Sequence, residues 1–402
     1  MSEPDGMDEY GESTGPCMPA HFYFHVPFCR SKCSYCDFAS VSGASPDVAF
    51  AVFTGMEAEV VRWGASALPG VVETVYVGGG TPSLHAAPVG RLLENVRRVL
   101  HVRDDAEITV EANPDSLTPA ALAALLDGGA NRISVGVQAF DDGVLRLLGR
   151  VHDSRQARAA LKLVRDAGVD LSVDLICGVP GQSMASWVES LEQTLDAGAL
   201  HVSVYPLALE EGTPLAAAVS GGLVSEPDPD LAADMMLLAE KRLGQAGIAR
   251  YEVANYAAPG HESRHNTAYW TGRSYVGTGP GAHGMLEPDV ARTVGLFRSR
   301  DKSDDVARVR YSNTADIDGW LTGAPVAVET LTAAEKARED VMLGLRLVVG
   351  VRAEAVAAAG VEAVLRALAD DGLTELVDAR WRTTQRGWLL GNEVFRRVWT
   401  AE

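Results

Sequence analysis

Apolar and polar positions alternate along this chain in two ways. Short runs rich in β-branched and aromatic residues predict strands, and longer segments between them repeat their apolar residues with helical periodicity. The predicted strands are His21–Val26, Val72–Val77, Glu107–Glu111, Asn131–Val137, Asp170–Ile176 and His201–Pro206. The predicted helices include Pro88–Val102, Pro119–Gly128, Ser154–Gly168 and Ser183–Gly198. A helix between two strands can serve as the right-handed crossover connection that parallel strands need. The alternating pattern therefore predicts an α/β fold built as a (β/α)6 partial TIM-type barrel. A doubly wound open sheet is the alternative topology.

Changes in this pattern divide the chain into four segments. Residues 1–19 are acidic and polar and predict a disordered tail, whereas residues 20–285 hold the barrel and a polar–aromatic segment after it. The pattern breaks around Arg300–Asp305, so residues 286–330 are expected to form a connector. Residues 331–402 predict a small C-terminal α+β domain that is winged-helix-like, with helices over Ala333–Leu347 and Val351–Ala369 and a β-rich end over Leu376–Leu390.

Composition narrows the class of protein. The chain has 402 residues, of which 47% are apolar and 22% charged, as in ordinary globular proteins. Its formal net charge of −19 disfavours binding to nucleic acid or to an anionic membrane. No apolar stretch reaches membrane-spanning length, and the acidic N-terminus does not have the pattern of a targeting segment. Its five cysteines do not form a disulfide framework, so we expect a cytoplasmic protein.

Three of the cysteines, Cys29, Cys33 and Cys36, fall within eight residues. This spacing lets three thiolates converge on one metal centre from a single loop. An iron–sulfur cluster normally takes four thiolates, so three would leave one iron open to an exchangeable ligand. A structural zinc site is the alternative, and it would need a fourth ligand from Cys17, His25 or Cys177. Because no second Cys-x-x-Cys pair is present, the spacing favours a three-thiolate cluster.

Other unusual residues follow the predicted strands at their carboxyl ends. The cysteines follow the first strand and Gly78-Gly79-Gly80-Thr81-Pro82 the second, while Glu111, Gln138 and Asp174 end the next three. Active sites of parallel α/β barrels lie at this end, so one shared site is predicted. Each residue also has a structural interpretation: the glycines as a tight turn, and the polar residues as locally hydrogen-bonded strand ends. Cys177 lies near the same end and is expected to be reactive.

A polar–aromatic segment runs from Tyr251 to Trp270 and contains His261 and His265, four residues apart. From chemistry alone, a packed loop with hydrogen-bonded histidines is the favoured interpretation.

The motif Cys-x-x-x-Cys-x-x-Cys, with Tyr35 before its last cysteine, resembles the radical S-adenosylmethionine (radical SAM) enzymes. Residues Tyr23 to Phe38 resemble the coproporphyrinogen dehydrogenase branch, and specifically its HemW subfamily. The resemblance extends from about His21 to the C-terminus. It implies a radical SAM barrel, a [4Fe–4S] cluster on the three cysteines, and SAM on the open iron. The residues that it assigns to SAM are Tyr23, Tyr35, Gly79, Gly80, Thr81, Glu111, Gln138, Arg150 and Asp174.

The segment His265-Asn266-x-x-Tyr269-Trp270 is a HemW hallmark. The resemblance therefore implies a heme chaperone that delivers heme to acceptor hemoproteins and takes an electron for its cluster from a donor. His265 is the first candidate for a heme contact and His283 the second. An oxygen-independent coproporphyrinogen III dehydrogenase is the alternative. Such enzymes carry a fourth cysteine two residues after the third, where this chain has Phe38. Whether SAM is cleaved in the functional cycle, through a 5′-deoxyadenosyl radical, stays open.

Overall fold

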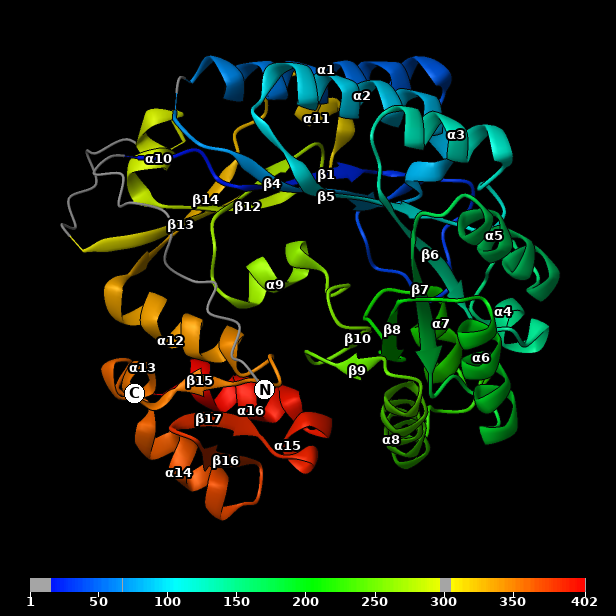
Figure 1. The fold of residues 1–402 in the computed structure, drawn as a ribbon, viewed down its shortest axis with the longest axis vertical. Coiled ribbons are helices and arrows are strands. Elements are labelled where there is room, and N and C mark those ends of the chain that lie inside the picture. Colours follow the sequence, from blue (N-terminus) through cyan, green and yellow to red (C-terminus); the bar gives the residue numbers. More distant parts are fainter. Residues whose placement is uncertain (1–15, 67, 297–304, 402) are drawn as a thin grey trace.

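The protein is seen in a computed structural model that describes residues 16–66, 68–296 and 305–401. Its largest element is a twelve-stranded sheet in the order β14-β13-β12-β11-β1-β4-β5-β6-β7-β8-β10-β9 (Figure 1). The expected disordered tail falls mostly on residues 1–15, outside the described part. Of the last tail residues, which the structure does describe, Met18 is buried and donates its backbone N–H to the Pro69 carbonyl at 2.8 Å.

The six predicted strands lie side by side in chain order and run parallel. They are β1 (His21–Val26), β4 (Val72–Gly79), β5 (Val102–Ala112), β6 (Arg132–Gln138), β7 (Asp170–Cys177) and β8 (His201–Pro206). A doubly wound sheet reverses its strand order partway, and this order does not reverse there. The predicted (β/α)6 partial barrel is confirmed, and the sheet does not close on itself.

Helices cover the outer face of these strands. They are α1 (Pro46–Ala65), α2 (Ala86–Val99), α3 (Pro119–Asp127), α5 (Ser154–Asp166), α6 (Met184–Asp196) and α8 (Pro229–Gln245). The short helices α4 (Asp142–Leu147) and α7 (Pro214–Ser220) lie instead at the carboxyl ends of the strands. Local sequence sets the starts of two of them, since Asp153 and Ser183, the residues just before α5 and α6, each form a capping box. Buried Val, Leu and Ile side chains from strands and helices form one continuous core between the two layers.

The sheet extends beyond the six strands on both sides. On one side, β11 (Tyr275–Thr278) pairs parallel with β1, and β12 (His283–Leu286), β13 (Val306–Ser312) and β14 (Ala327–Thr332) continue antiparallel. On the other side lie β10 (Asn255–Ala257) and β9 (Ala249–Arg250). Residues 286–330, expected as a connector, thus contribute two sheet strands with α10 (Pro288–Thr293) and α11 (Ile317–Leu321). Helix α9 (Arg264–Trp270) lies inside the curve of the sheet (Figure 1).

The C-terminal part packs around its own apolar core. After α12 (Ala333–Gly344), the segment Val351–Ala369, predicted as one helix, divides into β15 (Val351–Arg352), α13 (Ala353–Ala358) and α14 (Glu362–Asp370). Gly360 separates the two helices with a φ of +73°, which glycine adopts without strain. The predicted β-rich end holds β16 (Thr374–Val377) and β17 (Arg380–Thr383), and then α15 (Gln385–Leu389) and α16 (Gly391–Trp399). The strand order β15-β17-β16 beside helices agrees with the predicted α+β character.

In the described residues, no helix combines the length and apolar character needed to span a bilayer.

Candidate cofactor-binding site

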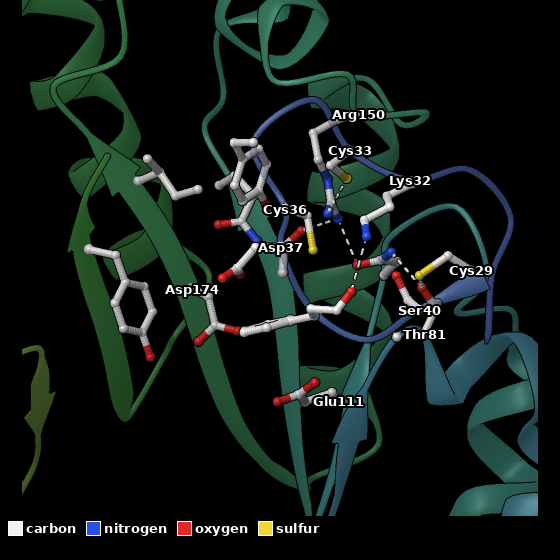
Figure 2. Close-up of a pocket in the computed structure, with 18 of the residues that line it drawn as sticks. Cys29, Lys32, Cys33, Cys36, Asp37, Ser40, Thr81, Glu111, Arg150 and Asp174 are labelled. Carbon is white, nitrogen blue, oxygen red and sulfur yellow. Dashed lines mark hydrogen bonds between the residues drawn. The ribbon is translucent and has the colours of Figure 1, made fainter. Parts of the chain in front are cut away.

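A cavity of about 410 Å³ opens at the carboxyl ends of the parallel strands (Figure 2). The structure brings most of the residues predicted from the sequence together around it. Those that line it are Cys29, Cys33, Tyr35, Cys36, Gly79, Gly80, Thr81, Glu111, Gln138, Arg150 and Asp174. They come from the cysteine loop, from strand ends far apart in the sequence and, for Arg150, from the segment between α4 and α5, so the parallel topology is what assembles most of the site.

Cys29 is the last residue of β2 (Phe28–Cys29), and Cys33 and Cys36 lie on the loop that connects it to β3 (Val41–Ser42), the strand with which β2 pairs. Ser34 fastens the loop to the end of α4, because its backbone N–H donates to the Leu148 carbonyl at 3.0 Å and its hydroxyl donates to the Leu147 carbonyl at 2.7 Å. All three thiols line the cavity, and Figure 2 shows their sulfur atoms above Glu111 in that view.

The donors around the sulfur atoms fit an iron–sulfur cluster. Arg150 Nη1 donates to Cys33 Sγ at 3.4 Å, and the Thr81 hydroxyl donates to Cys29 Sγ at 3.6 Å. Hydrogen bonds to sulfur stabilise thiolates and are one of the means by which proteins tune such clusters. The chemistry of this donor set therefore suits three thiolate ligands on one cluster.

Among the residues that the structure describes, none of the three candidates for a fourth zinc ligand is available at this loop. Both ring nitrogens of His25 are engaged, Nδ1 with the Tyr23 hydroxyl at 2.9 Å and Nε2 with the Ala39 carbonyl at 2.8 Å. Cys177 belongs to the buried core, where burial raises the pKa of its thiol to about 12, so the expectation of a reactive thiol was wrong. Cys17 precedes β1, at the end of that strand opposite the loop.

The glycines Gly78–Gly80 allow the backbone at the end of β4 to approach the backbone at the start of the cysteine loop closely. Gly80 N–H donates to the Val26 carbonyl and Thr81 N–H to the Phe28 carbonyl, both at 2.7 Å. A Cβ atom on Gly80 would lie 2.6 Å from that Phe28 oxygen, and one on Gly79, where φ is +107°, would lie 2.6 Å from the His25 ring. No other residue type fits these two positions without moving the loop.

Glu111 forms the floor of the cavity. Its Oε1 accepts from the Tyr76 hydroxyl at 2.8 Å and its Oε2 accepts from Gly79 N–H at 3.2 Å. Burial raises the pKa of Glu111 to about 7. A Cβ atom on Gly78 would lie 2.9 Å from the carboxyl carbon, so the first glycine leaves room for this side chain.

Arg150 and Gln138 shape the wall of the cavity. Arg150 Nη2 donates to Asn113 Oδ1 at 2.6 Å and to the Gly136 carbonyl at 2.8 Å. Gln138 has a φ of +66°, an uncommon conformation for a residue other than glycine, and the β6–β7 register shifts beside it. Such backbone strain concentrates at ligand sites.

Asp174 faces the same space from β7. Each of its carboxylate oxygens lies 3.3 Å from the donating Ser134 hydroxyl, and burial raises the pKa of Asp174. Ser134 and Tyr205 also line the cavity, and the sequence analysis missed both. Strand alternation could have found Ser134, because it lies two residues before Gly136, which also lines the cavity, and therefore faces the same side of β6.

Two predicted residues lie outside the cavity lining. Tyr23 points along the concave face of the sheet, where its hydroxyl meets His25. His265 is on α9 and only 1% exposed, with Nδ1 2.7 Å from Thr74 Oγ1 and Nε2 2.8 Å from the Tyr269 hydroxyl. Its ring has no free nitrogen for a heme iron, so the structure does not support the heme contact predicted there. His283, the second candidate, is exposed at the first residue of β12.

Comparison with known proteins identifies the class first. Residues 23–194 match the radical SAM superfamily, which is the class that this sheet and its cysteine loop define, and residues 331–390 match the HemN C-terminal domain. The chain is 38% identical to the heme chaperone HemW of Mycobacterium tuberculosis over 391 residues, 95% of each chain. It is 33% identical to heme chaperone HemW of Bacillus subtilis, over 93% of this chain and 97% of that one. The chain therefore belongs to the HemW family of radical SAM proteins.

The fold has a solved counterpart in the coproporphyrinogen III oxidase HemN of Escherichia coli, a radical SAM enzyme. The two superpose with a TM-score of 0.77 over 98% of this chain and 94% of that one, at 22% identity. At this identity the match establishes the fold alone. Radical SAM membership itself implies a [4Fe–4S] cluster and SAM.

Proposed function

We propose that this protein is a heme chaperone, which binds heme and transfers it to acceptor hemoproteins. The observation that carries the proposal is the set of relatives described as heme chaperones, which align with it over nearly the whole length of both chains. Three half-buried free cysteines on one loop suit a reducing compartment, so we propose that the protein works in the cytoplasm.

Cys29, Cys33 and Cys36 are the residues that would hold the cluster, and the remaining cavity residues would hold SAM. With both groups bound, the site would supply one-electron chemistry: an electron from a separate donor would pass through the cluster to SAM and break its carbon–sulfur bond, which would leave methionine and a 5′-deoxyadenosyl radical. The protein contributes acceptors and shape: Glu111 and Asp174 are buried carboxyl groups suited to the amino and hydroxyl groups of such a ligand.

An oxygen-independent coproporphyrinogen III dehydrogenase is the alternative function, because this chain shares its fold with the coproporphyrinogen III oxidase HemN. Phe38 distinguishes the two. It lines the mouth of the cavity with 60% of its surface exposed, where the dehydrogenases carry a cysteine. A phenyl ring offers an apolar face to a macrocycle but cannot exchange a proton with a substrate.

For the heme contact we propose His283 in place of His265. His283 is exposed at the same edge of the sheet as the cysteine loop, and a Cβ atom on nearby Gly281 would lie 2.8 Å from Ala39 in that loop. An accessible imidazole is what iron ligation requires.

The deciding experiment incubates anaerobically reconstituted protein with heme, and separately with coproporphyrinogen III, SAM and a reductant. We expect stoichiometric heme binding and transfer to an apo-hemoprotein, with no protoporphyrinogen formed. Steady vinyl-group formation over many turnovers would overturn the chaperone in favour of the dehydrogenase.

A further inference from the structure

Helix α9 carries the His265–Trp270 segment into the concave side of the sheet, below the cavity floor. The segment is held there by Glu107, a buried residue of β5. Glu107 accepts from the backbone N–H of Arg264 at 2.7 Å and of His265 at 3.1 Å, and from the Ser263 hydroxyl at 3.3 Å. Four residues further along the same face of β5 is Glu111. One strand thus fixes the helix and carries the carboxylate of the cavity floor.

Tyr76 fills the space between His265 and Glu111. Its ring stacks on the His265 ring, with centroids 5.2 Å apart and an angle of 28° between the planes. Its hydroxyl donates to Glu111 Oε1 at 2.8 Å. Below it, Thr74 Oγ1 lies 2.7 Å from His265 Nδ1 and 2.9 Å from His21 Nδ1. These side chains therefore form a continuous series of contacts from α9 to the cavity floor.

We call Thr74, His265, Tyr76 and Glu111 the column. Each contact in this column fixes the orientation of the next side chain. The hydrogen bonds to Thr74 and Tyr269 set the plane of the His265 ring, and stacking on that plane sets the plane of Tyr76. The Tyr76 hydroxyl then takes one lone pair of Glu111, while Gly79 N–H takes another. The carboxylate keeps one orientation, with its remaining lone pairs available to a ligand above.

We propose that Tyr76 and His265 are positioning residues for the SAM pocket, which hold the Glu111 carboxylate in place from below, and that His265 does not contact heme. The inference rests on the proposed function only in taking SAM as the ligand of the cavity. If the column served packing alone, the Tyr76 hydroxyl would not matter to any ligand.

The test measures the SAM dissociation constant of the full, anaerobically reconstituted chain. Removing the hydroxyl in Tyr76→Phe leaves the ring and its stacking, so iron content and melting temperature should hold. SAM affinity should fall about fivefold to tenfold, the factor expected for the loss of one ordinary hydrogen bond. His265→Gln, which keeps an amide near the Nε2 position, should lose less affinity than His265→Ala. The visible spectrum of bound heme should be the same in all three variants.

Two controls separate the possible failures. Tyr256 is a buried tyrosine on β10 whose hydroxyl has no hydrogen-bond partner among the described residues, so Tyr256→Phe should leave SAM binding unchanged. Asp174→Ala should weaken SAM binding with iron intact, and an unchanged affinity there would overturn the cavity as the SAM site, and this inference with it. If Asp174→Ala weakens binding and Tyr76→Phe does not, the positioning role alone is wrong. A changed heme spectrum in His265→Gln with unchanged SAM affinity would restore His265 as a heme ligand and overturn the inference.

Discussion

The guanidinium of Arg150 donates a hydrogen bond from Nη1 to the Sγ atom of Cys33, at 3.4 Å. The same side chain is fixed by Asn113 and the Gly136 carbonyl, which both accept from Nη2. A guanidinium carries five N–H donors, so Nη1 keeps one further hydrogen for a ligand. Arg150 can therefore contact a cluster ligand and a bound cofactor together.

Because of this contact, we expect Arg150 to affect the reduction potential of the cluster even without SAM. A positive hydrogen-bond donor at sulfur stabilises the more negative, reduced cluster, so Arg150→Gln should lower its midpoint potential. We expect a shift of about 40 mV, the one-electron equivalent of roughly 1 kcal/mol. A redox titration followed by electron paramagnetic resonance, without SAM, measures it. Arg146→Gln, an exposed neighbour on α4, is the control, and equal potentials in both variants would contradict the prediction.

Cluster assembly should depend on three of the five cysteines. Alanine at Cys29, Cys33 or Cys36 should abolish the broad visible absorbance of the anaerobically reconstituted protein and most of its bound iron and sulfide. Cys177→Ala is the matched control, because that thiol is buried in the core and lines no part of the cavity. Purified wild-type protein with tetrahedral zinc and no sulfide would refute the cluster.

Much of this architecture could be predicted from residue patterns. The bounds of β1 and β8 agree with the predicted strands residue for residue, because each is a short run of aromatic and β-branched residues that a proline ends. The cavity lining followed from strand ends, since parallel strands place their carboxyl ends on one edge.

The position of α9 could not be predicted in this way. Its anchor is the contact between Glu107 and Arg264, residues 157 positions apart, and no local periodicity encodes such a pairing. The residue pattern alone favoured a packed loop with hydrogen-bonded histidines, and only the family resemblance implied a heme contact at His265. Tertiary packing buries His265 on a helix and engages both of its ring nitrogens. The two-residue strand β15 was missed for a related reason: Val351–Arg352 continues the apolar pattern of the following helix and becomes a strand only by pairing with β17.

SAM binding should depend on pH through Glu111. Burial raises the pKa of this group to about 7, so a growing fraction is protonated below neutrality and no longer accepts from a ligand amino group. If the bound carboxylate stays ionised, affinity should fall up to about eightfold from pH 7.5 to pH 6, the ratio of ionised fractions. Calorimetric titration across this range should show the fall in the wild type. Glu111→Gln should bind more weakly at pH 7.5 and lose this component of the pH dependence, and an equal slope in both proteins would assign it to another group.

The same raised pKa has a consequence for the folded protein without ligand. In the unfolded chain Glu111 titrates near its ordinary value of 4.5, so between that pH and about 7 the folded state holds more protons. Stability from this group is therefore complete below the lower value and is lost as pH rises through the higher one. Relative to wild type, Glu111→Gln should gain melting temperature as pH rises from 5 to 7.5.

The glycine segment should be required for holding the cysteine loop. In Gly80→Ala the new Cβ atom would lie 2.6 Å from the Phe28 carbonyl oxygen and 2.8 Å from the Phe28 nitrogen and the Val26 oxygen. These are backbone atoms at the start of the loop, so the clash must move the loop instead of a flexible side chain. We expect a stability loss of about 1–3 kcal/mol together with a clear drop in reconstituted iron. Gly244→Ala is the control, because a Cβ atom there meets nothing within 4 Å and the site is helical, so it should be neutral or stabilising by about 0.5–1 kcal/mol. Full iron content in Gly80→Ala would show that the loop tolerates displacement and that the close approach of β4 is not what positions the cysteines.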